Sequence, residues 1–368
     1  LRQVKTFVAT DEATWSMGIQ NFMAGLQFET NEAVNGFGAA SAGYYVYSSL
    51  DDFYAGGKPA AYGITFPLDG SDQFKAKMKY NQFSAYIQDQ VNFSDRFRMT
   101  AGLRFELPIY PALKNNYNEA FAKIDFKDND GNTYHYSTDQ LPKAPLTVSP
   151  RVGFNWDVLG NQKVVLRGGT GYFIGRMPFV WLVSAVGNAG CGQYTYYYNS
   201  TDPSVAGKGP YPTEIGQPNF HVSRADQLAD LDISKAQVEA QGNSTVIDRD
   251  LKMNSTWKTS LAVDLKLPYD INFSLEGIYS RDFNPAVVKN VGRYWEGKTI
   301  TLCPGDTRHL YSQNSKDAYM ITNGGNKAHY YSITASLAKK FDFGLDLSAS
   351  YTYAKARSYS DGIGDQVS

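Results

Sequence analysis

The chain has 368 residues and a formal net charge of -1, so no overall field favours nucleic acid or acidic substrates as partners. Hydrophobic residues make up 42% of it, yet no apolar run approaches the roughly 18 residues of a membrane-spanning helix. Two cysteines and four scattered histidines fit no metal-ligand spacing, and no catalytic constellation is recognisable. We therefore expect no catalytic residues, no metal site and no cofactor.

The first predicted elements are two strands, Arg2–Thr10 and Thr14–Glu29. In the second, apolar residues fall on alternate positions from Trp15, and after one slip of parity the alternation resumes from Phe22. A period of two predicts a strand, and this one is about three times the usual length of roughly 5–6 residues. A strand so long, with one apolar and one polar face, is expected to separate two different environments.

Eight further strands follow as four hairpins with tight turns. Their turns are predicted at Ser94–Arg96, Leu159–Gln162, Pro268–Asp270 and Lys340–Asp342. The paired strands are Ala76–Phe93 with Phe97–Leu107, Val148–Asp157 with Lys163–Tyr172, Thr256–Leu267 with Ile271–Arg281, and His329–Lys339 with Phe343–Lys355.

The connections between hairpins are much longer than the turns. They cover about Pro108–Thr147, Gly175–Ser255 and Asp282–Lys327. Short strands at Gly43–Ser48 and Ala60–Phe66 and a helix within Asp226–Ala240 are expected in such outer segments. Tight turns at one end and long loops at the other are typical of an outer-membrane barrel.

Strand length supports the same fold class. A strand of about 11 residues rises roughly 36 Å and, tilted by about 45°, spans some 25 Å of membrane. Backbone groups in lipid find no water, so a spanning sheet must close on itself. The prediction is an all-β fold: an antiparallel transmembrane β-barrel, present in part as about ten long strands. A soluble β-sandwich or a β-solenoid fits less well, because sandwich strands are shorter and no fixed repeat is found.

The alternation also predicts which side chains face lipid and which face the barrel interior. The outward set is Leu261, Val263, Leu265, Phe273, Leu275, Leu345 and Leu347, and the inward set is Lys258, Asp264, Glu276 and Asp346.

One segment carries more than alternation. "FSAYIQDQVNFSDRFRMTAGLRFELP" (Phe83–Pro108) resembles the A-x-[YF]-x-Q-D … L-x-x-G-x-R-[YF]-[DE] strand pair of TonB-dependent outer-membrane receptors. Three further stretches look like the same family. They are "SPRVGFNWD" (Ser149–Asp157), "LRGGTGYFIGRMP" (Leu166–Pro178) and "LAVDLKLP…LEGIYSRDFN" (Leu261–Asn284), of which the last resembles a hairpin of the Oar-type and SusC-like branch.

The resemblance implies a 22-stranded barrel with an N-terminal plug and energy coupling through TonB. No plug signature is found, so residues 1–368 are expected to be a fragment of one receptor barrel domain in the cell outer membrane. The implied function is import of a scarce or large ligand such as an oligosaccharide, a peptide or a metal chelate. Outer-membrane lipid, TonB and a surface lipoprotein are the expected partners. The alternatives are a passive porin, an adhesin without energy coupling, and a rim-active enzyme.

Two candidate features lie in the outer segments. Four tyrosines, Tyr194, Tyr196, Tyr197 and Tyr198, could form a stacking surface for a ligand, or could extend a strand above the membrane. Cys191 and Cys303 lie in successive outer segments, where an oxidising environment permits a disulfide. Such a bond would hold the tyrosine segment in place.

Two other motifs are weighed against simpler explanations. Gly168–Gly175 lacks the helix and acidic residue of a dinucleotide-binding loop, so a glycine-rich strand is favoured. Asp125–Tyr134 has oxygen ligands that could hold calcium, but it lacks a closing glutamate, and Asp-Gly is a common turn.

Overall fold

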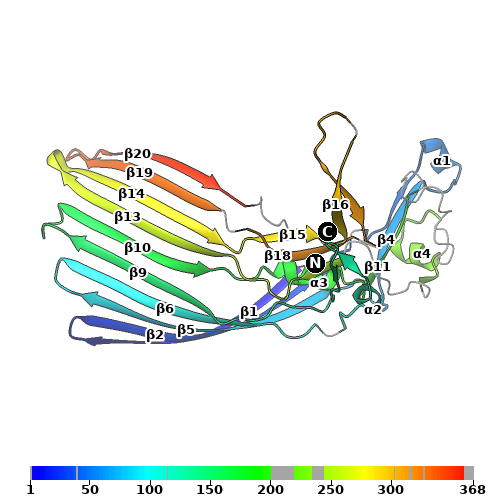
Figure 1. The fold of residues 1–368 in the computed structure, drawn as a ribbon, viewed down its shortest axis with the longest axis horizontal. Helices are drawn as coiled ribbons and strands as arrows, with labels where there is room; N and C mark the ends of the chain where they lie inside the picture. Colours follow the sequence, from blue (N-terminus) through cyan, green and yellow to red (C-terminus); the bar gives the residue numbers. More distant parts are fainter. Residues whose placement is uncertain are drawn as a thin grey trace.

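The computed structural model describes residues 2–38, 40–113, 115–199, 219–233, 244–301, 303–314, 317–325 and 328–359. Its main element is a ten-stranded antiparallel sheet whose strands are neighbours in chain order (Figure 1). They are β1 (Arg2–Met17), β2 (Gln20–Asn35), β5 (Ala76–Asn92), β6 (Phe97–Ile109), β9 (Thr147–Asp157), β10 (Val164–Ile174), β13 (Ser255–Leu267), β14 (Ile271–Phe283), β19 (His329–Lys340) and β20 (Asp346–Arg357).

The predicted fold class is confirmed. The sheet has the expected ten long strands in number, with other bounds in the first hairpin, and β1 and β20 form the two edges of an open, curved sheet. The chain therefore supplies part of a barrel wall. The tight turns lie together at one end of the sheet and the long connections leave from the other end (Figure 1). This is the predicted asymmetry.

The first hairpin differs from the prediction. The expected strand Thr14–Glu29 is two strands, because β1 ends at Met17 and β2 begins at Gln20, with these two residues paired across the turn. Gly18 has a φ of +59°, which glycine adopts without strain in a two-residue hairpin turn. The slip of parity in the sequence was therefore the turn itself, and the predicted break between Thr10 and Thr14 does not exist.

The register places the two predicted sets of side chains on opposite faces. Val263 lies opposite Leu166 and Leu275, whereas the adjacent Asp264 lies opposite Ser274. Directly opposed residues share a face, and successive residues alternate between faces. Helix α3 (Phe179–Gly187) packs on one face of β2 and β5. The register carries this face across the neighbouring strands to Asp264 of β13. The face of Asp264 is therefore the interior, and the face of Val263 is outward. Leu345 is the exception, since it lies in the turn before β20.

Aromatic side chains border the outward apolar face. Trp257 packs near Tyr172 at the loop end, with ring centroids 6.2 Å apart, and Phe341 packs near Phe343 at the turn end, at 5.3 Å. From Trp257 to Leu267, where β13 ends just before Tyr269, the strand runs ten residues, which is about 33 Å of strand and about 23 Å of membrane at a 45° tilt. This agrees with the apolar band of about 25 Å between the aromatic girdles of outer-membrane barrels.

We call the described parts of the four long connections the loop layer. It contains three small helices and one longer one: α1 (Leu50–Tyr54), α2 (Glu119–Ala122), α4 (Arg224–Ala229) and α3 (Phe179–Gly187). Its small sheets are formed by β3 (Tyr44–Val46), β4 (Ala61–Pro67) and β11 (Gln193–Asn199), by β12 (Ser244–Ile247), β15 (Ala286–Asn290) and β18 (Ala318–Asn323), by β16 (Arg293–Thr299) and β17 (His309–Gln313), and by β7 (Phe126–Lys127) and β8 (Thr133–Tyr134).

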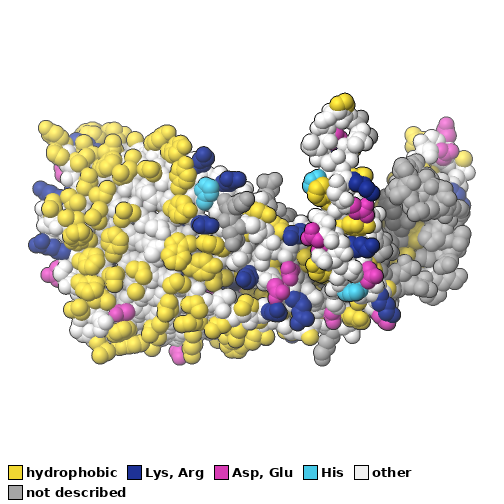
Figure 2. Space-filling view, viewed as in Figure 1, with side chains coloured by type: hydrophobic (Ala, Val, Ile, Leu, Met, Phe, Trp, Pro, Cys, Tyr) yellow, Lys and Arg dark blue, Asp and Glu magenta, His cyan; other side chains and the backbone are white. Residues whose placement is uncertain are grey.

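The short strands predicted in this layer are confirmed as β3 and β4. The predicted helix Asp226–Ala240 is shorter and begins earlier, as α4, and residues 234–240 lie outside the described part of the chain. No helix among the described residues has the length and hydropathy needed to cross a membrane. Hydrophobic side chains gather over the strands and charged ones over the loop layer (Figure 2).

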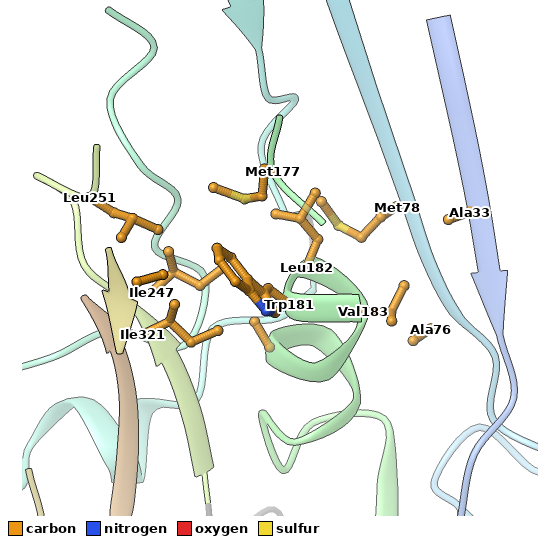
Figure 3. Packing of buried hydrophobic residues seen from close by; sticks show 12 residues of the cluster. Ala33, Ala76, Met78, Met177, Trp181, Leu182, Val183, Ile247, Leu251 and Ile321 are labelled. Carbon is orange, nitrogen blue, oxygen red and sulfur yellow. The ribbon is translucent and has the colours of Figure 1, made fainter. Parts of the chain in front are cut away.

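The largest apolar core lies at the loop end of the wall. Helix α3 fills it: Trp181 points toward Ile247 and Ile321 of β12 and β18, while Leu182 and Val183 point toward β2 and β5 (Figure 3). Leu182 is fully buried. The wall and the loop layer therefore share one core.

Candidate functional site

The inner face of β1, β2, β5 and β6 carries a connected row of polar side chains. Arg104 lies near its centre, with Nε donating to Glu106 Oε1 at 3.0 Å and Nη2 donating to Gln27 Oε1 at 2.9 Å. Gln82 donates to the same carboxylate at 2.9 Å. Strand alternation explains the row, because these residues occupy every second position on neighbouring strands. The row gives the barrel interior a polar lining of both charge signs.

A second charged group lies farther along the inner face. Arg167 of β10 donates to Asp264 Oδ2 of β13 at 2.8 Å, and its Nη1 is 3.6 Å from Glu276 Oε1 of β14. Ser274 donates to the other oxygen of Asp264 at 2.6 Å. Two of the three predicted inward carboxylates, Asp264 and Glu276, are thus joined by an arginine. Next to them the inner face is hollowed by a concavity of 610 Å³ that reaches the turn end.

The inner wall is tied to the segment that carries α3. Arg176 Nη1 donates to both carboxylate oxygens of Glu29, at 2.9 and 2.8 Å, and Asn31 donates to Glu29 at 2.7 Å. Glu29 is only 7% exposed, so its charge is held in place almost away from water. Charge-assisted hydrogen bonds of this kind are stronger than neutral ones. They fix the start of α3 against β2.

Side chains from separate connections lock the loop layer together. Asn118, ahead of α2, donates to the Ala189 carbonyl after α3 at 3.0 Å, and Asn188 donates to Thr245 Oγ1 of β12 at 3.1 Å. Asn118 also caps α2 by accepting from the Phe121 amide at 3.0 Å. Asn118 lies in the connection between β6 and β9, and Asn188, Ala189 and Thr245 lie in the connection between β10 and β13, so these two connections are tied together over the inner wall.

The tyrosine segment forms β11, which pairs with β4. Tyr196 is 1% exposed and packs against Tyr62, Ile64 and Phe66, so it belongs to a small core and cannot offer a stacking face to a ligand. This corrects the prediction for Tyr196. Tyr194 is half-buried beside Phe66.

The side chains of Tyr197 and Tyr198 lie outside the described part, and their role stays a prediction. In the same core, burial raises the pKa of Tyr62 far above its usual range. Such a hydroxyl stays neutral, as expected of a residue that packs in a core.

The predicted disulfide is not formed in this structure. Cys191 and Cys303 are both free, the first half-buried and the second exposed in the segment between β16 and β17. Figure 1 shows that the tip of the hairpin formed by β16 and β17 projects from the loop layer, and β11 is held by its pairing with β4 and not by a disulfide. Burial raises the pKa of the Cys191 thiol, with a smaller contribution from the charge of Asp139.

The glycine-rich stretch forms a strand and the aspartate-rich stretch contains a turn, as the simpler explanations predicted. Gly168–Gly175 lies in and just after β10. Asp128 is the centre of a turn between β7 and β8, where its Oδ1 accepts from the amides of Asp130 and Asn132, each at 2.9 Å. Among the described residues no group of three or more His, Cys, Asp or Glu is placed to hold a metal ion.

The sequence did not predict helix α3 or the ion pair between Glu29 and Arg176, which holds the start of α3 and which we call the Glu29–Arg176 latch. The apolar run from Phe179 to Gly187 is too short to span a membrane, yet it follows a proline, which is a recognisable helix start. Arg176 was visible as the last residue of the L-R-G-G-x-G-x-F-x-x-R segment. Its partner Glu29 lies 147 residues away, and no local pattern connects them.

Strands of membrane length, an outward apolar face between aromatic borders and a polar inner face define the wall of an outer-membrane β-barrel. The model of the outer membrane beta barrel domain family matches residues 1–367, and the chain belongs to this family. The cell outer membrane is therefore its location. A search of curated proteins finds no match.

Two solved structures share the fold. The outer membrane transporter YddB from Escherichia coli is similar with a TM-score of 0.53 and 11% identity, covering 96% of this chain and 34% of that one. The ferric enterobactin receptor PfeA from Pseudomonas aeruginosa, solved with BCV-L6, is similar with a TM-score of 0.50 and 13% identity, covering 96% of this chain and 36% of that one. The chain spans about a third of the length of these transporters and receptors.

Proposed function

We propose that this chain is part of the barrel of a TonB-dependent receptor of the Oar-type and SusC-like branch, which imports a ligand too scarce or too large for passive pores. An oligosaccharide, a peptide or a metal chelate would fit this role. The observation that carries the proposal is the loop layer, which is tied to a polar inner wall by Glu29–Arg176 and by the α3 core. A passive pore needs a clear opening, whereas a packed layer narrows the mouth and offers a surface that can select a ligand.

The proposal includes the parts of the protein with which this chain would work. The chain would form one piece of the barrel domain, and a plug domain elsewhere in the protein would fill the interior and contact TonB. The row of polar side chains around Arg104 offers hydrogen-bonding groups with positive and negative charge, which could contact the plug domain or a passing ligand. A surface lipoprotein is a further candidate partner over the loop layer. Binding and release would involve no covalent chemistry.

The test uses the full-length protein in a planar lipid bilayer with potassium chloride on both sides. A receptor closed by a plug is expected to give no steady conductance, and a form lacking the plug is expected to conduct. Steady open steps from the intact protein would instead identify a passive porin. Energy coupling is tested separately by pull-down with the C-terminal domain of TonB. Absence of binding there would leave no basis for TonB-dependent import.

A further inference from the structure

The outward face of β1, β2, β5 and β6 carries an apolar groove of 500 Å³, which lies near the middle of β1, β2 and β5 and near the loop end of β6. Large side chains form the walls of the groove and small ones form its floor. The walls are Leu26, Phe28, Phe83 and Leu107, and the floor is Ala9 and Ala85. Phe28 and Phe83 pack with ring centroids 4.8 Å apart. The register places all six on the outward face, because Phe83 lies opposite Phe28 and Leu107, and Ala9 lies opposite Phe28.

The groove lies in the half of the membrane next to the loop layer. Leu146, which immediately precedes β9 at the loop end, also lines it. Leu26 is 64% exposed and Phe83 is 49% exposed, so nothing in the described part of the chain covers the groove. On a face that must meet lipid, an acyl chain is the natural occupant of such a hollow.

Three lysines stand directly above the groove on the same face. Glu32 pairs in register with Lys5 on one side and with Lys79 on the other, and it forms ion pairs with Lys79 at 3.2 Å and Lys77 at 3.4 Å. Three cations around one carboxylate leave an excess of positive charge. From Phe83 to Lys79 is four residues, about 13 Å along the strand. That distance separates the upper acyl region of a lipid from its headgroup.

We propose that this groove and the lysines above it form a binding site for a phosphorylated, anionic membrane lipid. The acyl chain lies on the alanine floor between the aromatic walls, and the phosphate contacts Lys5, Lys77 and Lys79. Asp11 lines the opposite end of the groove. Its carboxylate repels a phosphate, so the orientation of the lipid is set. The site does not depend on the imported ligand, and it would serve to hold the wall in the outer leaflet.

The experiment is native mass spectrometry of the full-length protein in detergent, titrated with phosphatidylglycerol or with phosphatidylcholine of the same acyl chains. The wild type is expected to retain phosphatidylglycerol at much lower concentration than phosphatidylcholine. The double variant Lys77→Gln/Lys79→Gln is expected to lose about 25-fold in retention of phosphatidylglycerol, about fivefold per lysine, and to retain phosphatidylcholine as before. Ala85→Phe fills the floor of the groove and is expected to weaken retention of both lipids.

The matched control is Lys123→Gln/Lys298→Gln in the loop layer. Each of these lysines also pairs with a glutamate, Glu119 at 2.7 Å and Glu296 at 3.2 Å, so the control loses comparable ion pairs without touching the groove. Equal retention of the two lipids by the wild type would overturn the proposal. It would also be overturned if the control variant lost as much phosphatidylglycerol as the Lys77/Lys79 variant, or if the latter variant lost none.

Discussion

Replacing Val263 by arginine tests the assignment of the two faces of the wall most directly. Val263 lies midway between Trp257 and Tyr269, so it is close to the middle of the membrane, with Leu166 and Leu275 beside it on the outward face. An arginine at the midplane of the lipid-facing side of a barrel costs about 2–4 kcal/mol. That corresponds to a shift of roughly 30- to 700-fold in the folding equilibrium. We expect Val263→Arg to reduce the folded fraction accordingly.

The control is Ser336→Arg, because Ser336 is adjacent in sequence to Ala335, which lies opposite Leu275 at the same depth as Val263. Ser336 is on the inner face and lines the 610 Å³ concavity, which has room for the longer side chain. The assay is urea-dependent folding of the full-length protein into lipid vesicles, followed by its heat-modifiable migration on gels. Equal stability of Val263→Arg and wild type, or an equal loss in Ser336→Arg, would refute the assignment of faces.

Three further predictions concern the loop layer. Glu29→Gln weakens the charge-assisted hydrogen bonds that hold the start of α3, and it should reduce the stability of this attachment by about 1–3 kcal/mol. We expect faster proteolysis between β10 and β11 on intact cells, and an unchanged cleavage rate would contradict the role of the Glu29–Arg176 pair. Tyr196→Ala should destabilise the β3–β4–β11 unit by about 3–5 kcal/mol in hydrogen exchange, and Tyr194→Ala by clearly less, whereas similar effects would argue against a buried Tyr196. Burial favours the neutral thiol of Cys191, so maleimide should label Cys191 more slowly than the exposed Cys303 at pH 7. The difference in rate should shrink as the pH rises through the raised pKa of Cys191. Equal labelling rates of the two cysteines at pH 7 would contradict this prediction.

The long strands could be predicted from the sequence because the signal is local. Lipid on one side and polar groups on the other impose a period of two on every strand, whatever the rest of the chain does. The hairpin turns at Ser94–Arg96, Leu159–Gln162 and Pro268–Asp270 were also local and were placed correctly, whereas the last turn is longer than predicted and ends at Leu345. The first hairpin was missed because the change of parity at Gly18 and Ile19 was interpreted as an irregularity within one strand.

The loop layer could not be predicted in the same way. Tyr196 resembled its neighbouring tyrosines in the sequence, and only its pairing with Ile64 of β4, 132 residues away, made it a core residue. The two cysteines were placed in neighbouring outer segments correctly, but both are free in this structure, and Cys303 lies in the turn between β16 and β17, whose hairpin projects from the layer (Figure 1).

The sequence by itself determined the membrane wall: the number of long strands, their faces, and the end at which the loops lie. Only the tertiary structure decided what covers that wall, namely the α3 core, the Glu29–Arg176 latch and the joined loop layer. The physical reason is the range of the interactions. Alternation toward lipid and water acts on each residue separately, whereas a core or an ion pair exists only when segments distant in the chain are brought together.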